Sequence, residues 1–262
     1  MLELRNASWE AGGRRIVDDV STTFVAGGFH VIIGPNGAGK TSLLRLATGS
    51  LTPTSGEVRF ARRPIGEYGT IGLARRRAVL SQHVELAFPL EVEDVVMMGR
   101  YPHFARAPHA EDRRIVSEAL ALVEMLPQRK QWYPTLSGGE QQKVQLARVL
   151  AQIWDDAEGA VATRALFLDE PTASLDIHYQ IHLLDVARDL AARGCTVVAI
   201  LHDLNTALEY GTHFLVLEQG RVALQCEAAS DIPQELIERV FRVHARRVAE
   251  PGQRGRVWRF SK

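Results

Sequence analysis

The sequence lacks an excess of charge of either sign. Its 31 lysine and arginine residues balance 31 aspartate and glutamate residues, so the formal net charge is zero. A balanced chain has no overall field that would draw it onto nucleic acid or anionic lipid. We therefore expect no nucleic-acid partner, and we interpret short arginine runs such as 75–77 as solvated surface.

Cysteine and long apolar segments are also scarce. The two cysteines, Cys195 and Cys226, have neither the spacing of a zinc site nor that of a disulfide framework. Cys195 opens an apolar run, which predicts a small buried hydrophobic residue. No run approaches the roughly 20 apolar residues that span a bilayer, and the first residues lack the features of a signal peptide. We expect a chain that reaches a membrane only through other subunits.

What is present is enough apolar sequence for one large α/β domain over residues 1–262, of which 46% are hydrophobic. The first residues read as strands separated by paired-glycine turns, and the middle section shows helical periodicity. From about residue 140 onward helix and strand alternate, which predicts a parallel sheet with right-handed crossovers. Residues 231–262 predict one helix with short strands.

The strongest motif is a glycine-rich loop between an apolar strand, 31–33, and a periodic helix, about 41–47. Glycines allow backbone N–H groups to converge on phosphate oxygens, and the helix N-terminus adds partial positive charge. Lys40 is expected to reach the β- and γ-phosphates, and Thr41 to place its hydroxyl on Mg²⁺. The predicted nucleotide-binding residues are Gly34, Pro35, Asn36, Gly37, Ala38, Gly39, Lys40, Thr41 and Ser42.

A second motif supplies the acids that such a loop needs. Four apolar residues, 165–168, predict a buried strand that ends in Asp169 and Glu170. In open α/β sheets the carboxyl ends of the strands line the ligand crevice. We expect Asp169 to hold Mg²⁺, directly or through water, and Glu170 to orient and deprotonate the attacking water.

A third motif, Leu-Ser-Gly-Gly-Glu at 136–140, stands at a predicted helix start. Ser137 is a good cap, and Gly138 and Gly139 expose further N–H groups beside Glu140. The chain would thus have two anion sites for one nucleotide. One economical interpretation is that this site binds the γ-phosphate of a nucleotide held by another copy, so that two chains close two sites head to tail.

This Leu-Ser-Gly-Gly-Glu stretch resembles the signature of ABC ATPases, and the resemblance extends over nearly the whole chain. It implies an α/β phosphate-loop ATPase with an N-terminal antiparallel β subdomain. It also implies a helical subdomain at about 84–145 that carries the signature, and a short C-terminal extension at about 231–262. The cofactors implied are ATP and Mg²⁺, and the assembly implied is a homodimer that binds ATP across its interface.

Four further residues match family positions. Gln82 resembles the glutamine that senses Mg²⁺ and couples to the membrane subunits, and Asp176 the loop residue that touches the opposite site. His202, after the apolar run 196–201, resembles the histidine that contacts the γ-phosphate. Trp9 resembles the aromatic residue that stacks on adenine. Apart from the resemblance, each could be an ordinary surface or structural residue.

Two stretches bear on the transported substrate. Residues 92–103 are similar to those of ATPases that serve iron–siderophore, haem and cobalamin importers, although a helix and proline turn that only packs would look alike. Residues 152–164 form a longer connection with a tryptophan, Trp154, similar to that of hemin-importer ATPases. The resemblance implies a haem importer, with ferric siderophore or cobalamin import as the alternative.

The resemblance also implies partners and a location. These are two integral membrane permease subunits, a periplasmic substrate-binding protein, and the cytoplasmic face of a bacterial inner membrane. A soluble ABC ATPase in cofactor assembly is a less favoured alternative. Repair and translation ATPases usually carry long insertions or two ATPase halves, and this sequence has neither.

Overall fold

The computed structural model describes residues 1–81, 89–154, 164–172, 175–249 and 256–261. Gln82, Ser174 and most of the 152–164 connection therefore lie outside the described residues. In the part of the chain that is described, no helix is both long and apolar enough to cross a membrane.

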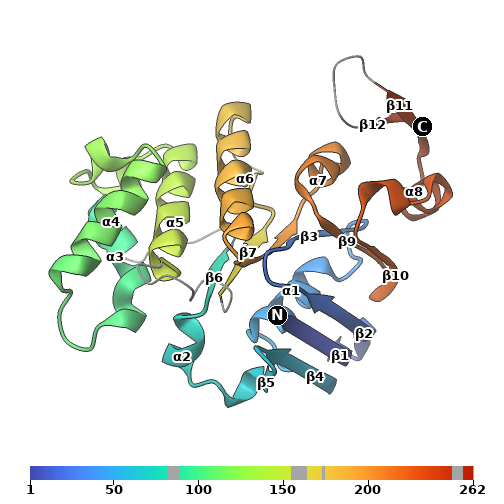
Figure 1. Ribbon diagram of the computed structural model, residues 1–262, viewed down its shortest axis with the longest axis horizontal. Coiled ribbons are helices and arrows are strands. Elements are labelled where there is room, and N and C mark those ends of the chain that lie inside the picture. Colours follow the sequence, from blue (N-terminus) through green and yellow to red (C-terminus); the bar gives the residue numbers. More distant parts are fainter. Residues whose placement is uncertain (82–88, 155–163, 173–174, 250–255, 262) are drawn as a thin grey trace.

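A six-stranded sheet forms the centre of the molecule, in the order β10-β9-β3-β8-β7-β6 (Figure 1). Five of its strands run parallel, as the alternation of helix and strand predicts. The edge strand β10 runs antiparallel to β9, because a tight turn joins the two directly. The strands are β3 (Phe29–Ile33), β6 (Arg77–Leu80), β7 (Ala165–Asp169), β8 (Thr196–Ile200), β9 (His213–Glu218) and β10 (Arg221–Cys226).

A second, antiparallel sheet is built from the N-terminal strands in the order β2-β1-β4-β5. One side of it and one face of the central sheet enclose a hydrophobic core in which helix α1 (Lys40–Thr48) is buried. This helix therefore lies between the two sheets, directly after β3. The strands are β1 (Leu2–Ala11), β2 (Arg14–Phe24), β4 (Ser55–Phe60) and β5 (Arg63–Pro64).

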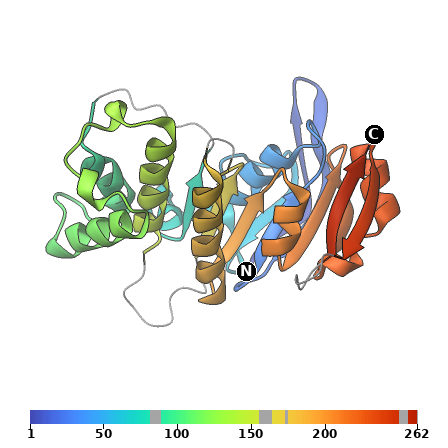
Figure 2. The same cartoon turned by 90° about the horizontal axis from the view of Figure 1, so that it is seen from above.

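The other face of the central sheet is covered by helices that share a second hydrophobic core. Helices α3, α4 and α5 lie together at one end of the molecule, and α7, α8 and the hairpin β11–β12 lie at the other (Figures 1 and 2). The α-helices are α2 (Thr70–Ala74), α3 (Val92–Met97), α4 (Ala110–Leu122), α5 (Gly138–Gln152), α6 (Ile177–Ala192), α7 (Leu204–Tyr210) and α8 (Gln234–Phe241). The 3-10 turns are η1 (Ile65–Glu67), η2 (Met98–His103), η3 (Leu126–Gln128), η4 (Tyr133–Thr135) and η6 (Ala229–Asp231), and the hairpin strands are β11 (His244–Ala249) and β12 (Arg256–Ser261).

Candidate nucleotide site

The glycine-rich loop joins the buried strand β3 to the N-terminus of α1, as predicted. Gly39 caps α1 with a positive φ of 96°, a conformation that glycine adopts without steric cost. Backbone carbonyl groups of two other segments also approach the loop closely. A side chain at Gly34 would place its Cβ atom 2.2 Å from the carbonyl oxygen of Leu217, and one at Gly39 would lie 2.5 Å from that of Ile16. Both glycines are therefore required by close backbone approach.

Lys40 is buried against this loop. Its Nζ atom donates hydrogen bonds to the carbonyl oxygens of Gly34, at 2.8 Å, and Pro35, at 2.9 Å. Burial lowers the pKa of the ammonium group, while the carboxylates of Glu170 and Asp169 oppose that shift. The side chain thus spans the loop with its charge held over the backbone, where a phosphate can take the place of the carbonyl acceptors.

The turn between β9 and β10 packs against the loop, a contact that the sequence did not predict. The backbone N–H of Gly220 donates to the carbonyl of Ala38 at 3.0 Å, and the carbonyl of Gly220 accepts from Asp18 at 2.9 Å. Gln219 and Gly220 both have positive φ, as the central residues of a tight hairpin turn do. The only sequence signal was the glycine in the turn, because the contact itself joins segments about 180 residues apart.

The two predicted metal-binding residues of the described chain meet at the end of β7. The hydroxyl of Thr41 donates to Oδ1 of Asp169 at 3.3 Å. Burial raises the pKa of the Asp169 carboxyl; the Thr41 hydrogen bond opposes this, and the nearby Glu170 adds to it. A hydroxyl and a carboxylate are oxygen donors that suit Mg²⁺. The pair fits a magnesium ion, which would relieve the electrostatic cost of the two adjacent acids.

Glu170 and His202 form the third contact of the site. They follow neighbouring strands, β7 and β8, at the carboxyl edge of the sheet, where Nε2 of His202 lies 2.7 Å from Oε1 of Glu170. Glu170 has a φ of 53°, which is uncommon for a residue with a side chain. Strained backbone of this kind clusters at functional sites, where it aims a side chain. The carboxylate is therefore placed beside the phosphate loop with a histidine to orient it.

The signature segment begins helix α5 with a reciprocal cap, as its sequence predicts. The Ser137 hydroxyl donates to Oε2 of Glu140 at 2.6 Å, and the backbone N–H of Ser137 donates to the same oxygen at 2.9 Å. These hydrogen bonds lower the pKa of the Glu140 carboxyl. Ser137 and Gly138 are exposed, and in the described structure the Ser137 side chain has no contact with the phosphate loop of its own chain. The exposed cap can therefore contact a ligand that is not bound to the phosphate loop of the same chain.

Of the remaining predicted residues, Trp9 and Asp176 are described. Trp9 is half-buried on β1, paired with Val17. Ile16, next to Val17 in the chain, has its carbonyl oxygen against Gly39 of the phosphate loop. Trp9 therefore lies near this loop. Asp176 is exposed and caps helix α6, accepting a hydrogen bond from the Tyr179 N–H at 2.8 Å. Cys195 is buried as expected, and burial raises the pKa of its thiol to about 12.

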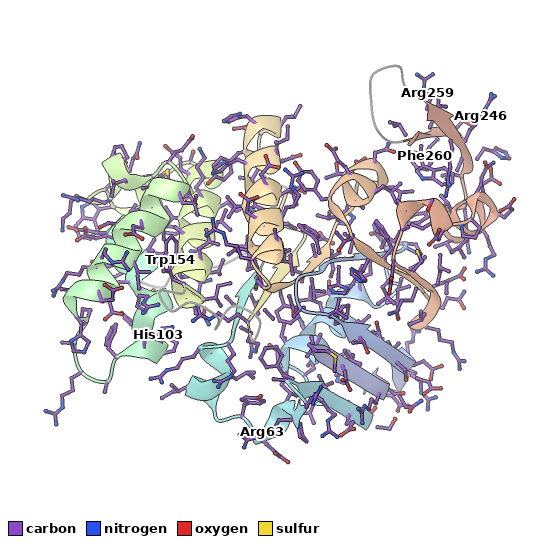
Figure 3. The ribbon with its side chains drawn as sticks, viewed as in Figure 1. Arg63, His103, Trp154, Arg246, Arg259 and Phe260 are labelled. Atoms are coloured by element: carbon purple, nitrogen blue, oxygen red, sulfur yellow. The ribbon has the colours of Figure 1, made fainter. Side chains whose placement is uncertain are left out.

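The 92–103 stretch forms α3 and η2, tied to α4, to the end of α5 and to β6. Buried Arg100 forms an ion pair with buried Asp112 at 3.0 Å and donates to the Ala151 carbonyl. His103 contacts the carbonyl of Gln152 at 2.8 Å, and the Gln152 side chain donates to the carbonyls of Ala74 and Arg77. Figure 3 shows His103 and Trp154 at this end of the molecule. The stretch is part of a connected unit, which the sequence alone did not reveal.

Comparisons with known proteins agree with this geometry. A family model described as ABC transporter matches residues 17–173. The hemin import ATP-binding protein HmuV of Bradyrhizobium diazoefficiens is 43% identical over 245 residues, which cover 94% of this chain and 90% of that protein. Its namesake from Agrobacterium fabrum is 44% identical over 241 residues, covering 92% of this chain and 91% of that protein.

Solved structures share the fold. An inward-facing metal-chelate type ABC transporter aligns with a TM-score of 0.81 at 22% identity, covering 99% of this chain and 96% of that chain. A dimeric ATP-binding cassette bound to ADP and phosphate aligns with a TM-score of 0.72 at 24% identity, covering 87% of this chain and 98% of that chain. These likenesses confirm the phosphate-loop α/β fold with its antiparallel N-terminal sheet.

Proposed function

The chain belongs to the ABC transporter family as an ATP-binding subunit, and from that premise we propose that it hydrolyses ATP to power haem import across a bacterial inner membrane. The observation that carries the ATPase assignment is the meeting of Lys40, Thr41–Asp169 and Glu170–His202 at one edge of the sheet. The haem assignment is supported by relatives named hemin import ATP-binding proteins.

Each residue of the site has a separate role in binding or hydrolysing the nucleotide. Lys40 and the N–H groups of the loop bind the β- and γ-phosphates, and Trp9 stacks on the base. Thr41 and Asp169, together with Gln82, would hold Mg²⁺, which would neutralise charge that develops on the phosphates. Glu170 orients the attacking water and accepts its proton, and His202 holds the carboxylate in place and contacts the γ-phosphate.

The exposed signature completes a site on a second copy. Ser137, Gly138 and Gly139 would present a hydroxyl and N–H groups to the γ-phosphate held by the partner, with Asp176 beside them. A cassette of the same fold that is dimeric supports the pairing of two copies. ATP binding then closes the dimer, hydrolysis reopens it, and two membrane permease subunits convert the motion into alternating access. We place the dimer on the cytoplasmic face, with a periplasmic binding protein that delivers the substrate.

Glu170→Gln tests the assignment of the base. The amide keeps the shape of the side chain but cannot accept a proton, so turnover should fall by about 10²- to 10⁴-fold while ATP affinity is retained. Steady-state phosphate release and equilibrium nucleotide binding measure the two effects. Glu209→Gln removes an exposed carboxylate on α7 and should leave both unchanged. Phosphate release by Glu170→Gln at the parental rate would show that another group is the base.

Transport in vesicles tests the substrate. The chain is combined with its cognate permease and supplied in separate experiments with haem, a ferric siderophore and cobalamin. We expect ATP-dependent uptake of haem alone, and loss of that uptake with Glu170→Gln. Uptake of the siderophore or cobalamin in preference to haem would reassign the substrate, and recovery of only soluble partners in pull-downs would favour a role in cofactor assembly.

A further inference from the structure

The zero net charge of the chain conceals a strong asymmetry. Residues 242–262 contain seven arginine and lysine residues and one acidic residue, Glu250. This segment therefore has a formal charge of +6, and the other residues together have a formal charge of −6. Four of these basic residues belong to the strands of the hairpin β11–β12: Arg246, Arg247, Arg256 and Arg259.

One face of the hairpin is firmly attached to the body. Trp258 is buried, and the Asn205 side chain forms two hydrogen bonds with its backbone, at 2.8 Å and 3.0 Å. Arg247 lies over the Trp258 ring and donates to the carbonyls of Ala229, Ser230 and Ile232. This arginine is fully used in holding the hairpin. These contacts anchor the hairpin to the body of the protein.

The opposite face of the hairpin carries two arginines that are exposed to solvent. Residues directly paired across the two strands share a face, and Arg246 is paired with Arg259. Both are exposed, and neither has an ion pair or side-chain hydrogen bond within the described residues. Figure 3 shows them at the extremity of the hairpin. We call this the outer face: His244, Arg246 and Val248 on β11, and Val257, Arg259 and Ser261 on β12.

This arrangement is costly unless something neutralises it. Like charges directly opposite one another in a hairpin destabilise the pairing. Opposite charges at these two positions would protect the strands from aggregation equally well. The inner face shows that the hairpin can satisfy an arginine, since Arg247 has three carbonyl acceptors and a ring. The two outer guanidiniums instead present adjacent, unpaired forks that match carboxylates.

We propose that the outer face of the hairpin docks an acidic, extended segment of a soluble protein partner. Val248 and Val257, which are paired with each other, lie beside the arginines on this outer face. Together they offer apolar contact that a protein segment can use and an inorganic anion cannot. The hairpin also lies at the end of the molecule opposite α3–α5 (Figures 1 and 2). Gln82, which the proposed function couples to the permease, is followed in the chain by α3 at that other end. With the permease there, the hairpin stays accessible to a soluble partner and not to lipid.

A labelled peptide of alternating glutamate and valine residues tests this proposal with the full chain at physiological ionic strength. Fluorescence anisotropy should detect binding to the parental chain. The double variant Arg246→Ala/Arg259→Ala should bind about tenfold more weakly or worse. The matched control, Arg14→Ala/Arg113→Ala, removes two exposed arginines from β2 and α4 and should bind within about twofold of the parent.

Basal ATP hydrolysis should be equal in all three proteins, because none of these arginines touches the nucleotide site. A failure of the docking proposal is thereby separated from a failure of the ATPase assignment. Equal peptide affinity in the parent and in Arg246→Ala/Arg259→Ala overturns the proposal. Full competition by millimolar inorganic phosphate overturns it in favour of a simple anion site. Arginine-dependent binding to phosphatidylserine vesicles or single-stranded RNA, without peptide binding, overturns it in favour of that ligand.

Discussion

At the residue scale, the acids of the nucleotide site are arranged for ligand binding, and this arrangement lowers the stability of the protein without ligand. Asp169 is largely buried at the end of β7, next to the carboxylate of Glu170. The Thr41 hydroxyl, Arg45 and Lys40 favour the ionised carboxylate, but burial and the like charge of Glu170 outweigh them and raise its pKa. Active sites commonly hold such unfavourable groups because function requires them.

Asp169→Asn should therefore stabilise the free protein while it abolishes Mg-ATP turnover. The folded-state pKa of Asp169 is raised, so the folded chain binds this proton more tightly than the unfolded chain does. That stability is present at acidic pH and is lost as the pH rises through the raised pKa. The neutral amide of asparagine does not ionise, so this loss of stability does not occur, and its oxygen can still accept the Thr41 hydrogen bond. We expect the melting temperature at pH 7.5 to increase by about 1–3 °C.

The pH dependence distinguishes this cause from a general effect of the substitution. The gain in melting temperature over the parental chain should shrink as the pH is lowered through the raised pKa of Asp169, because the carboxyl then becomes protonated itself. Asp189→Asn, an exposed substitution on α6, should change the melting temperature little at either pH. A lower melting temperature for Asp169→Asn at pH 7.5 would mean that the ionised carboxylate stabilises the fold.

At the element scale, the phosphate loop depends on a neighbour that is distant in sequence. The β9–β10 turn and the end of β9 contact the loop through backbone atoms of Leu217 and Gly220. Glu218, at the start of the turn, also forms an ion pair with Arg239 on α8 at 3.2 Å. The loop therefore takes its shape from the far edge of the sheet as well as from its own glycines.

Gly34→Ala tests this support. The new methyl group would lie 2.2 Å from the Leu217 carbonyl oxygen, so the loop or β9 must move. We expect ATP affinity to fall at least about tenfold and the free energy of unfolding to fall by about 2–4 kcal/mol. Isothermal titration and urea unfolding measure these effects. Gly66→Ala is the control, because an added Cβ atom there would meet nothing within 4 Å; it should change neither quantity. Parental ATP affinity in Gly34→Ala would refute the argument.

At the scale of the whole molecule, the exposed signature predicts a dimer held together by nucleotide. Glu170→Gln with Mg-ATP should elute at the mass of a dimer by light scattering, since the bound ATP persists. Adding Ser137→Asp should return it to a monomer. Aspartate caps a helix as well as serine does, but it places negative charge against the partner's γ-phosphate. ATP binding by the monomer should be retained.

The same experiment with Ser230→Asp in place of Ser137→Asp controls for added charge. Ser230 is exposed near α8, away from the signature, so this double variant should remain dimeric. Persistence of the dimer in Glu170→Gln/Ser137→Asp would contradict binding of the signature to nucleotide in trans. Loss of ATP binding by the monomer would show instead that Ser137 acts within its own chain.

The sequence by itself determined the local elements that carry the chemistry. The phosphate loop, the Asp169–Glu170 pair at a strand end and the Ser137 cap could all be predicted, because each rests on conformational and hydrogen-bonding preferences of residues close together in the chain. Helix α6 (Ile177–Ala192) is part of the alternation of helix and strand that the sequence predicts after about residue 140. The alternation of helix and strand predicted a parallel sheet, and the structure then gave the number and order of its strands.

Only the tertiary structure decided which distant groups meet. The contact of Gly220 with Ala38, the buried pair Arg100–Asp112 and the anchoring of Trp258 by Asn205 join segments that no local preference relates. The opposition of Arg246 and Arg259 depends on strand register, and a shift of one residue would place each on the other face. Such contacts are selected by packing and register in the whole fold, so they appear only once the chain is folded.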